Sequence, residues 1–221
     1  MSKPAPLSAR LAAEGMGTAF LLMTVIGSGI MGERLAAGNV AIALLANSIA
    51  TGSALAVLIL IFAPLSGAHF NPAVTLCMAA QGKITKRDAC AYIAVQFVAA
   101  IIGVIAAHIM FGEPLLFAST KIRTGGSQWW SEFVATFGLL TVIWFCVRQS
   151  LAAVPFAVAA YITAAYWFTA STSFANPAVT IARAMSDTFA GIRPQDALPF
   201  IMAQLAGALA ATAFASWTLK R

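Results

Sequence analysis

The sequence predicts an all-α membrane protein with six transmembrane helices and two re-entrant half-helices, arranged as an inverted repeat. Of its 221 residues, 61% are hydrophobic and only 9% are charged, against roughly a quarter charged residues in an ordinary soluble domain. Six apolar segments are each long enough to cross a hydrocarbon layer of about 30 Å as a helix. The pentapeptide Asn-Pro-Ala-Val-Thr occurs twice, at residues 71–75 and 176–180. Together these features indicate a duplicated membrane fold whose halves meet at a shared centre.

The six predicted spans account for most of the chain. The first contains Glu14, lacks a clear cleavage site and precedes five equally apolar segments, so we interpret it as a span and not as a cleaved signal peptide. We therefore expect residues 1–221 to form one membrane domain. In order, the predicted spans are residues 11–31, 40–62, 89–110, 130–147, 152–170 and 197–217.

Matched landmarks extend the duplication over two halves, about residues 8–112 and 126–219. Glu14 corresponds to Glu132, each in the first helix of its half, and Gln96 corresponds to Gln204, each in the last. Each half is predicted to contain two helices, an Asn-Pro-Ala segment and a third helix. Because three spans is an odd number, the second half enters from the opposite face, which produces a pseudo-twofold axis in the membrane plane.

The segments around the two tripeptides are predicted to be re-entrant. Residues 66–70 and 171–175 are too polar and irregular to continue a span, whereas Asn is a preferred N-cap and Pro suits the first helical position. The stretches that follow, residues 72–80 and 177–185, would be only about 14 Å long as helices, roughly half of the hydrocarbon thickness. Irregular backbone at that depth requires a protein interior or a water-filled cavity.

Two half-helices that enter from opposite faces would meet end to end near the midplane. Their positive N-termini would repel cations and hydronium. Neutral molecules could accept hydrogen bonds from the two Asn amides and donate to exposed carbonyls of residues 67–70 and 172–175. We therefore predict a pore for neutral solutes, with its centre formed by Asn71, Pro72, Ala73, Asn176, Pro177 and Ala178.

These features closely resemble the aquaporins and aquaglyceroporins, which are the major intrinsic proteins. The stretch Ser-Gly-Ala-His-Phe-Asn-Pro-Ala-Val-Thr at residues 66–75 is a specific match, and the resemblance covers nearly the whole chain. It implies a homotetramer with one pore in each subunit. We expect no cofactor and no metal. It also implies that Glu14 and Glu132 are buried acceptors that brace the re-entrant loops. The alternative for both carboxylates is a place at the membrane interface near a helix end.

The constriction of the pore is expected to depart from the family pattern. Most members have arginine directly after the second tripeptide, where this chain has Val179. The family alignment suggests Thr51, Ala164 and Ser173 as the other lining residues. All four are small, whereas water-selective members usually place an aromatic residue, a His and an Arg there. We therefore expect a wider, less polar constriction that passes solutes larger than water.

Several further residues have two possible roles. Arg183, four residues after Val179, could reach back to the pore mouth or form an ion pair with Asp187 on the outer surface; of the two, we expect the ion pair. His69 is expected on the pore wall or in a hydrogen-bonded structural role. His108 is expected at the membrane interface, and Tyr166 as an interface anchor or in helix packing.

The charges indicate orientation and exclude one class of partner. Basic residues are dispersed over short loops, which does not match a nucleic-acid-binding face. On the side of the two termini lie Lys3, Arg10, Lys83, Lys86, Arg87, Arg148, Lys220 and Arg221, and on the other side Arg34, Lys121, Arg123, Arg183 and Arg193. By the positive-inside rule, we expect cytoplasmic termini, in a bacterial inner membrane.

The expected function is passive conduction of small neutral solutes, with membrane lipid around the protein. Residues 176–183 and 187–194 look like a bacterial subgroup associated with arsenic-resistance operons. That likeness implies arsenite and methylated arsenicals as solutes, alongside glycerol and water. A water-selective aquaporin is the first alternative, and a secondary transporter with inverted repeats is the second. An enzyme is disfavoured because the sequence contains no recognisable metal cluster, nucleophile–base pair or carboxylate dyad.

Overall fold

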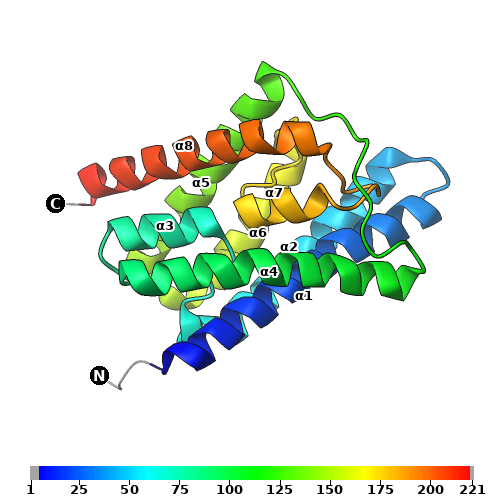
Figure 1. The fold of residues 1–221 in the computed structure, drawn as a ribbon. Helices are drawn as coiled ribbons and strands as arrows, with labels where there is room; N and C mark the ends of the chain where they lie inside the picture. Colours follow the sequence, from blue (N-terminus) through cyan, green and yellow to red (C-terminus); the bar gives the residue numbers. More distant parts are fainter. Residues whose placement is uncertain (1–4, 220–221) are drawn as a thin grey trace.

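The structure, a computed structural model, describes residues 5–219 and is all-helical over that range (Figure 1). Six helical segments are long and apolar enough to cross a membrane, as predicted, and one of them, Leu151–Phe168, joins a short 3-10 helix to the α-helix that follows it. The helices are α1 (Leu7–Leu35), α2 (Val40–Ser66), α3 (Pro72–Ala80), α4 (Lys86–Phe111), α5 (Gly126–Gln149), α6 (Val154–Phe168), α7 (Pro177–Arg183) and α8 (Pro194–Thr218), and a short 3-10 helix (Leu151–Ala153) precedes α6. The expected terminal charges Lys3, Lys220 and Arg221 lie outside the described residues.

The first turn of α1 and the last turn of α8 lie on one side of the bundle (Figure 1). We call this the terminal side. Because the long helices alternate in direction, the connections 112–125 and 184–193 lie on the opposite side, which we call the loop side. The short helices α3 and α7 start in the middle of the protein and run to the terminal side and the loop side, respectively.

The helix packing repeats in the two halves. Helix α1 packs against α2 and α4, and α5 packs against α6 and α8. Contacts between the halves also come in related pairs, since α3 touches α8 and α7 touches α4, while α2 packs against α6. Each half-helix therefore packs against the last helices of both repeats, α4 and α8, which places both half-helices at the centre of one domain.

Two glycines allow the first and last helices of each half to approach closely. A Cβ atom at Gly103 would lie 2.4 Å from the Ala19 carbonyl oxygen, and one at Gly207 would lie 2.3 Å from the Phe133 carbonyl oxygen. Both distances are too short for any side chain, so these crossings require glycine. Small residues at helix contacts are the usual means of close packing in membranes.

The half-helices begin where the sequence predicts, at Pro72 and Pro177. Helix α3 also ends as predicted at Ala80, but α7 stops at Arg183, two residues earlier than expected. The reason is tertiary: the carbonyls of Ala184 and Met185 accept hydrogen bonds from the backbone of Ser119 and Phe117. The chain therefore leaves the helix to pair with the connection 112–125.

Candidate pore and its constriction

The two Asn-Pro-Ala segments meet through their asparagine side chains. Asn71 Nδ2 donates to the Ala175 carbonyl at 2.7 Å, and Asn176 Nδ2 donates to the Phe70 carbonyl at 2.8 Å. Each Oδ1 caps its own half-helix, accepting from Ala73 N and from Ala178 N, both at 2.9 Å. This arrangement fixes each amide so that its NH₂ group points across the junction, and one N–H of each group is left over for a solute.

The loops before the asparagines contain backbone that side-chain-bearing residues rarely adopt. Phe70 and Ala175, the residues directly before the two asparagines, both have φ of 49°. Such left-handed conformations persist only where surrounding structure holds them. Their carbonyls were expected to serve solutes, but each accepts an asparagine amide of the opposite half. These two carbonyls therefore join the halves of the protein.

Two buried glutamates hold these loops. Glu14 Oε1 accepts from Ser66 Oγ at 2.7 Å and from His69 N at 2.9 Å, while Oε2 accepts from Phe70 N at 2.7 Å and Gln96 Nε2 at 2.9 Å. Both Glu14 and its counterpart Glu132 are fully buried. The alternative of a place at the membrane interface therefore does not hold for either carboxylate.

Glu132 repeats this arrangement in the second half. It accepts hydrogen bonds from the backbone of Phe174 and Ala175, both at 2.9 Å, and from Gln204 Nε2 at 2.6 Å. In each half one buried carboxylate thus binds the two backbone N–H groups that precede the half-helix. Charge-assisted hydrogen bonds of this kind are about twice as strong as neutral ones. They therefore help to offset the energetic cost of the strained backbone in these loops.

The Val-Thr continuation of each tripeptide completes the bracing network. Gln96 Nε2 also donates to Thr75 Oγ1 at 3.0 Å, and that hydroxyl donates to the Asn71 carbonyl at 3.0 Å. In the other half, Gln204 Nε2 donates to Thr180 Oγ1 at 2.9 Å. In the sequence the two glutamines stand out only as matched landmarks of the repeat. Their equivalent positions in the two halves, together with the repeated threonines, were the signal for this role.

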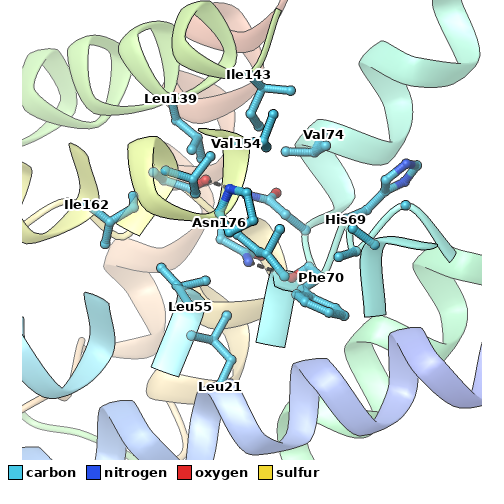
Figure 2. A pocket seen from close by; sticks show the side chains of 18 of the residues that line it. Leu21, Leu55, His69, Phe70, Val74, Leu139, Ile143, Val154, Ile162 and Asn176 are labelled. Carbon is cyan, nitrogen blue, oxygen red and sulfur yellow. Dashed lines mark hydrogen bonds between the residues drawn. The ribbon is translucent and has the colours of Figure 1, made fainter. Parts of the chain in front are cut away.

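A cavity of about 760 Å³ passes the paired asparagines and extends to both sides of them. Lys83, Trp144 and Leu151 line it on the terminal side, and Val179 and Arg183 line it on the loop side. Figure 2 shows apolar side chains around the asparagine junction. They come from α1, α2, α5 and α6 and include Leu21, Leu55, Leu139, Ile143 and Ile162. Such walls offer an ion no substitute for its hydration shell.

Three of the four expected constriction residues, Thr51, Ser173 and Val179, line this cavity. Ala164 does not: it lies on the exposed face of α6. Besides Pro155 in its first turn, the residues of α6 that line the cavity are spaced four apart at Val154, Val158, Ile162 and Tyr166. Because successive residues of a helix are rotated by about 100°, Ala164 points away from this face.

Tyr166 takes the place expected for Ala164, and its hydroxyl donates to Thr51 Oγ1 at 3.2 Å. The constriction is therefore not free of aromatic residues, contrary to the prediction, and Tyr166 is not an interface anchor. The four-residue spacing along residues 154–166 was a signal in the sequence that could have identified this face of the helix.

Arg183 is buried and lines the cavity, so the prediction of a surface ion pair with Asp187 is wrong. Its Nε donates to the Ala190 carbonyl, and its Cζ lies 3.3 Å from the centroid of the Phe174 ring. Asp187 instead accepts from the backbone N of Thr120 at 2.8 Å. The chain turns sharply after α7, and this turn directs the arginine inward and the aspartate toward the connection 112–125.

A second guanidinium, that of Arg123, lies over the same Phe174 ring as Arg183, and no sequence signal marks it as a site residue. Arg123 Nε donates to the Gly191 carbonyl at 2.8 Å and Nη1 to the Ser171 carbonyl at 3.0 Å, and its Cζ is 5.0 Å from the Phe174 ring centroid. Burial lowers the pKa of Arg123 to about 10, so it remains charged at neutral pH. Burial and the two arginine charges also lower the pKa of Lys121 to about 8. Of these three cations Arg183 lines the cavity, and Arg123 and Lys121 lie behind its loop-side wall.

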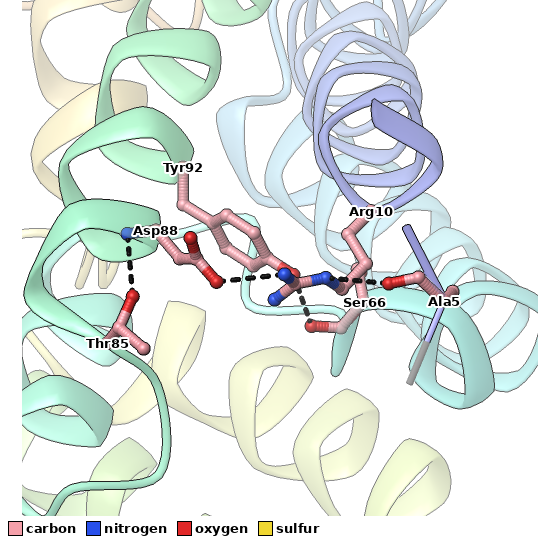
Figure 3. A network of polar contacts seen from close by, with 6 residues as sticks. All are labelled: Ala5, Arg10, Ser66, Thr85, Asp88 and Tyr92. Atoms are coloured by element: carbon pink, nitrogen blue, oxygen red, sulfur yellow. Dashed lines mark hydrogen bonds and ion pairs between the residues drawn. The ribbon is translucent and has the colours of Figure 1, made fainter. Parts of the chain in front are cut away.

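On the terminal side, His69 lines the cavity while its Nδ1 lies 3.1 Å from Thr75 Oγ1, so both expected roles apply to it. Its ring also contacts Tyr92, with 5.4 Å between centroids. Figure 3 shows how Tyr92 and Arg10 anchor this side. Tyr92 Oη donates to the Ser66 carbonyl at 3.0 Å, and Arg10 pairs with Asp88 at 2.8 Å.

His108 is fully buried and is not an interfacial residue, contrary to the prediction. Its Nε2 lies 2.8 Å from Ser186 Oγ, and its Nδ1 lies 2.9 Å from the Leu115 carbonyl. Through these two hydrogen bonds its ring joins residues 112–125 to residues 184–193 on the loop side. Polar groups of this kind are buried where hydrogen-bond partners satisfy them.

Comparisons with known proteins agree with this architecture. Residues 2–150 match the sequence profile of the family described as "Major intrinsic protein". Aquaglyceroporin AqpS of Rhizobium meliloti (strain 1021) is 53% identical over 214 residues, covering 97% of this chain and 91% of that protein. Aquaporin NIP1-1 of Arabidopsis thaliana is 28% identical over 152 residues, covering 65% of this chain and 50% of that protein.

The fold is also similar to a solved structure, that of the aquaglyceroporin from Plasmodium falciparum. The TM-score is 0.74 at 19% sequence identity, with 97% of this chain and 96% of that chain covered. The profile match, the relative that is 53% identical and the shared fold lead to one conclusion. The chain is an integral membrane protein that belongs to the major intrinsic protein family.

Proposed function

We propose that this protein is a passive channel for small neutral solutes, with glycerol-like polyols and water as the principal class. The observation that carries the proposal is the cavity that passes between the two half-helix N-termini, where Asn71 and Asn176 each retain an N–H donor. Cations are opposed by the two positive helix ends, and the apolar walls oppose ions of either sign. A neutral molecule with an acceptor oxygen meets neither barrier.

We further propose that metalloid hydroxides such as arsenite, and methylated arsenicals, pass through the same channel. Arsenous acid is neutral at pH 7 and close to a small polyol in shape. The small side chains of Thr51, Ser173 and Val179 at the constriction support passage of solutes of that size. The relative that is 53% identical is named an aquaglyceroporin, which is in line with solutes larger than water.

A water-selective channel is the second candidate, and a specific observation favours it. Tyr166 and Arg183 line the same cavity as the three small residues. They bring to the loop side an aromatic ring and a cation, the residue types that water-selective members of the family usually have at the constriction. The hydrogen bond from Tyr166 to Thr51 also joins two walls of the constriction at 3.2 Å.

We further propose a homotetramer in a bacterial inner membrane, with the terminal side in the cytoplasm. The distribution of exposed charge supports this orientation. Two of the basic residues on the loop side, Arg123 and Arg183, are buried and do not act as free loop charges. This strengthens the excess of Lys and Arg on the terminal side, by which the positive-inside rule assigns the cytoplasmic face.

The test is an uptake panel in proteoliposomes, with protein-free vesicles as the control. Stopped-flow light scattering measures water and glycerol permeability, and a parallel assay measures uptake of arsenous acid. We expect glycerol to equilibrate down its gradient at a rate that protonophores and sodium gradients do not change. Gradient-driven accumulation would indicate a secondary transporter instead, and water flux without glycerol flux would favour the water-selective candidate.

A further inference from the structure

We propose that Arg183 and Ser173 form a solute-binding subsite at the constriction, which selects solutes carrying two neighbouring oxygen atoms, such as 1,2-diols. In this subsite Arg183 provides the cation that is missing at Val179, from one turn further along α7. The inference rests on the proposed function, because it names the solutes that the neutral-solute channel prefers.

The first argument is the unused hydrogen-bonding capacity of Arg183. A guanidinium carries five N–H donors in one plane. Within residues 5–219, the single hydrogen bond of this side chain is from Nε to the Ala190 carbonyl. The four N–H groups on the two Nη atoms therefore have no protein acceptor, although Arg183 is only 2% exposed and lines the cavity. Molecules in the cavity that carry oxygen atoms are therefore the acceptors available to these four N–H groups.

The second argument is that no carboxylate of the described residues forms an ion pair with Arg183. In the described part of the chain the ion pairs are Arg10–Asp88, Arg34–Glu113 and Arg193–Asp196, and none includes Arg183. The buried carboxylate of Glu132 is engaged with the Phe174 and Ala175 backbone and with Gln204. A buried charge without a partner is costly, so a solute that accepts hydrogen bonds from it gains more than it would at a neutral wall.

The third argument is an unpartnered hydroxyl on the residue that directly precedes Phe174 in the chain. Ser173 is 3% exposed and lines the cavity, and its Oγ has no hydrogen-bond partner among residues 5–219. Ser173 directly precedes Phe174, the ring on which the Arg183 guanidinium stacks at 3.3 Å. Buried polar atoms are normally satisfied, which indicates that Ser173 Oγ is a binding group for a molecule in the cavity.

Together these groups define the chemistry of the preferred solute. Arg183 offers only donors, whereas the Ser173 hydroxyl can donate or accept. A molecule with two adjacent oxygens can accept from the guanidinium with one and exchange a hydrogen bond with the hydroxyl through the other. The hydroxyls of Thr51 and Tyr166 bond to each other at 3.2 Å and are less available. The subsite should therefore distinguish a 1,2-diol from its 1,3-isomer.

Arg123 provides a matched control. It is also buried and also lies over the Phe174 ring, at 5.0 Å from the centroid. Its Nε and Nη1 are already bonded to the Gly191 and Ser171 carbonyls, and it is not among the residues that line the cavity. Replacing it by lysine removes a guanidinium from the same ring without removing a donor from the cavity.

The experiment compares 1,2-propanediol with 1,3-propanediol, which have the same atoms and nearly the same size. Permeability to each is measured in proteoliposomes of the wild type and of Arg183→Lys, Ser173→Ala and Arg123→Lys. We expect the wild type to favour the 1,2-isomer. Lysine keeps the charge but loses the planar fork, so Arg183→Lys should lower the preference about fivefold, as expected for loss of one hydrogen bond to the solute. Ser173→Ala should lower it in the same direction, while Arg123→Lys should keep the wild-type ratio.

Equal ratios in the wild type, Arg183→Lys and Ser173→Ala would overturn the subsite while leaving the channel function intact. An equal loss of preference in Arg123→Lys and Arg183→Lys would also overturn it, since a general disturbance around Phe174 would then explain the result. A wild type that passes neither diol would instead refute the proposed function. If Arg183→Lys fails to reconstitute, Ser173→Ala decides the question, because an unchanged ratio in that variant contradicts the subsite.

Discussion

The substitution Glu14→Gln removes one acceptor oxygen from a site on which four donors converge. Those donors are Ser66 Oγ, the backbone N–H groups of His69 and Phe70, and Gln96 Nε2, all within 2.9 Å. A glutamine amide has one oxygen and one NH₂ group, so in either orientation its NH₂ group faces the backbone N–H of His69 or of Phe70, which then has no acceptor. The side chain keeps its size, and the substitution therefore isolates the hydrogen bonds from packing.

The expected loss of stability follows from the number of donors left unsatisfied. A buried donor without a partner costs about 1–3 kcal/mol, and this is the expected loss because the Ser66 hydroxyl and the Gln96 amide can reorient to accept. For a chain of this length, that loss corresponds to a fall in the melting temperature on the order of 2–12 °C. Glycerol flux should also fall, because the released backbone N–H, at residue 69 or 70, precedes the Asn71 cap at the centre of the cavity.

The assay is thermal unfolding of the purified protein in detergent, and Glu33→Gln is the control. Glu33 lies on the same helix but is exposed, and exposed substitutions of this kind change stability by about 0.5 kcal/mol or less. We expect Glu14→Gln to melt well below Glu33→Gln, which should match the wild type. Indistinguishable melting of the two variants would refute the bracing role assigned to the buried carboxylate.

Three further predictions address the constriction, the centre and the loop side. Val179 lines the cavity, and Val179→Arg should lower glycerol permeability by about tenfold or more, equivalent to a barrier higher by about 1.4 kcal/mol. Some water flux should remain in stopped-flow assays. Unchanged glycerol uptake would contradict a constriction at Val179. Asn176→Asp should raise the proton leak, because a carboxylate cannot donate to the opposite loop and places negative charge between two positive helix ends. The leak is measured with a pH dye trapped in vesicles, and Asn71→Asp should act in the same direction. Variants that remain tight to protons would argue against this barrier. Burial and two neighbouring arginines lower the pKa of Lys121 from 10.5 to about 8. Between about pH 8 and pH 10.5, Lys121 therefore carries a proton in the unfolded chain but not in the folded protein. The contribution of Lys121 to the free energy of unfolding should therefore rise with pH over that window, and a melting series at pH 7.5 to 10 should show a smaller rise for Lys121→Gln than for the wild type.

The spans, the half-helices and the inverted repeat could be read from local signals. Hydropathy over about 20 residues identifies a membrane helix because the bilayer sets its length, and the Asn-Pro pairs mark both half-helix starts at Pro72 and Pro177. The repeated positions of Glu14 and Glu132 indicated buried acceptors because a carboxylate inside a membrane requires protein partners. Each of these features depends on a short stretch of chain and on the solvent around it.

The constriction depended on information that no single segment contains. Whether Ala164 or Tyr166 faces the cavity is decided by the rotation of α6 about its axis, which packing against α2 and α5 determines. The inward turn of Arg183 and the place of Arg123 beside it depend on how the loop-side connections pair over Phe174. The sequence alone thus determined which elements form and how they enter the membrane, because these follow from local hydropathy and capping. Only the tertiary structure decided which side chains meet at the constriction, because that depends on contacts between distant segments.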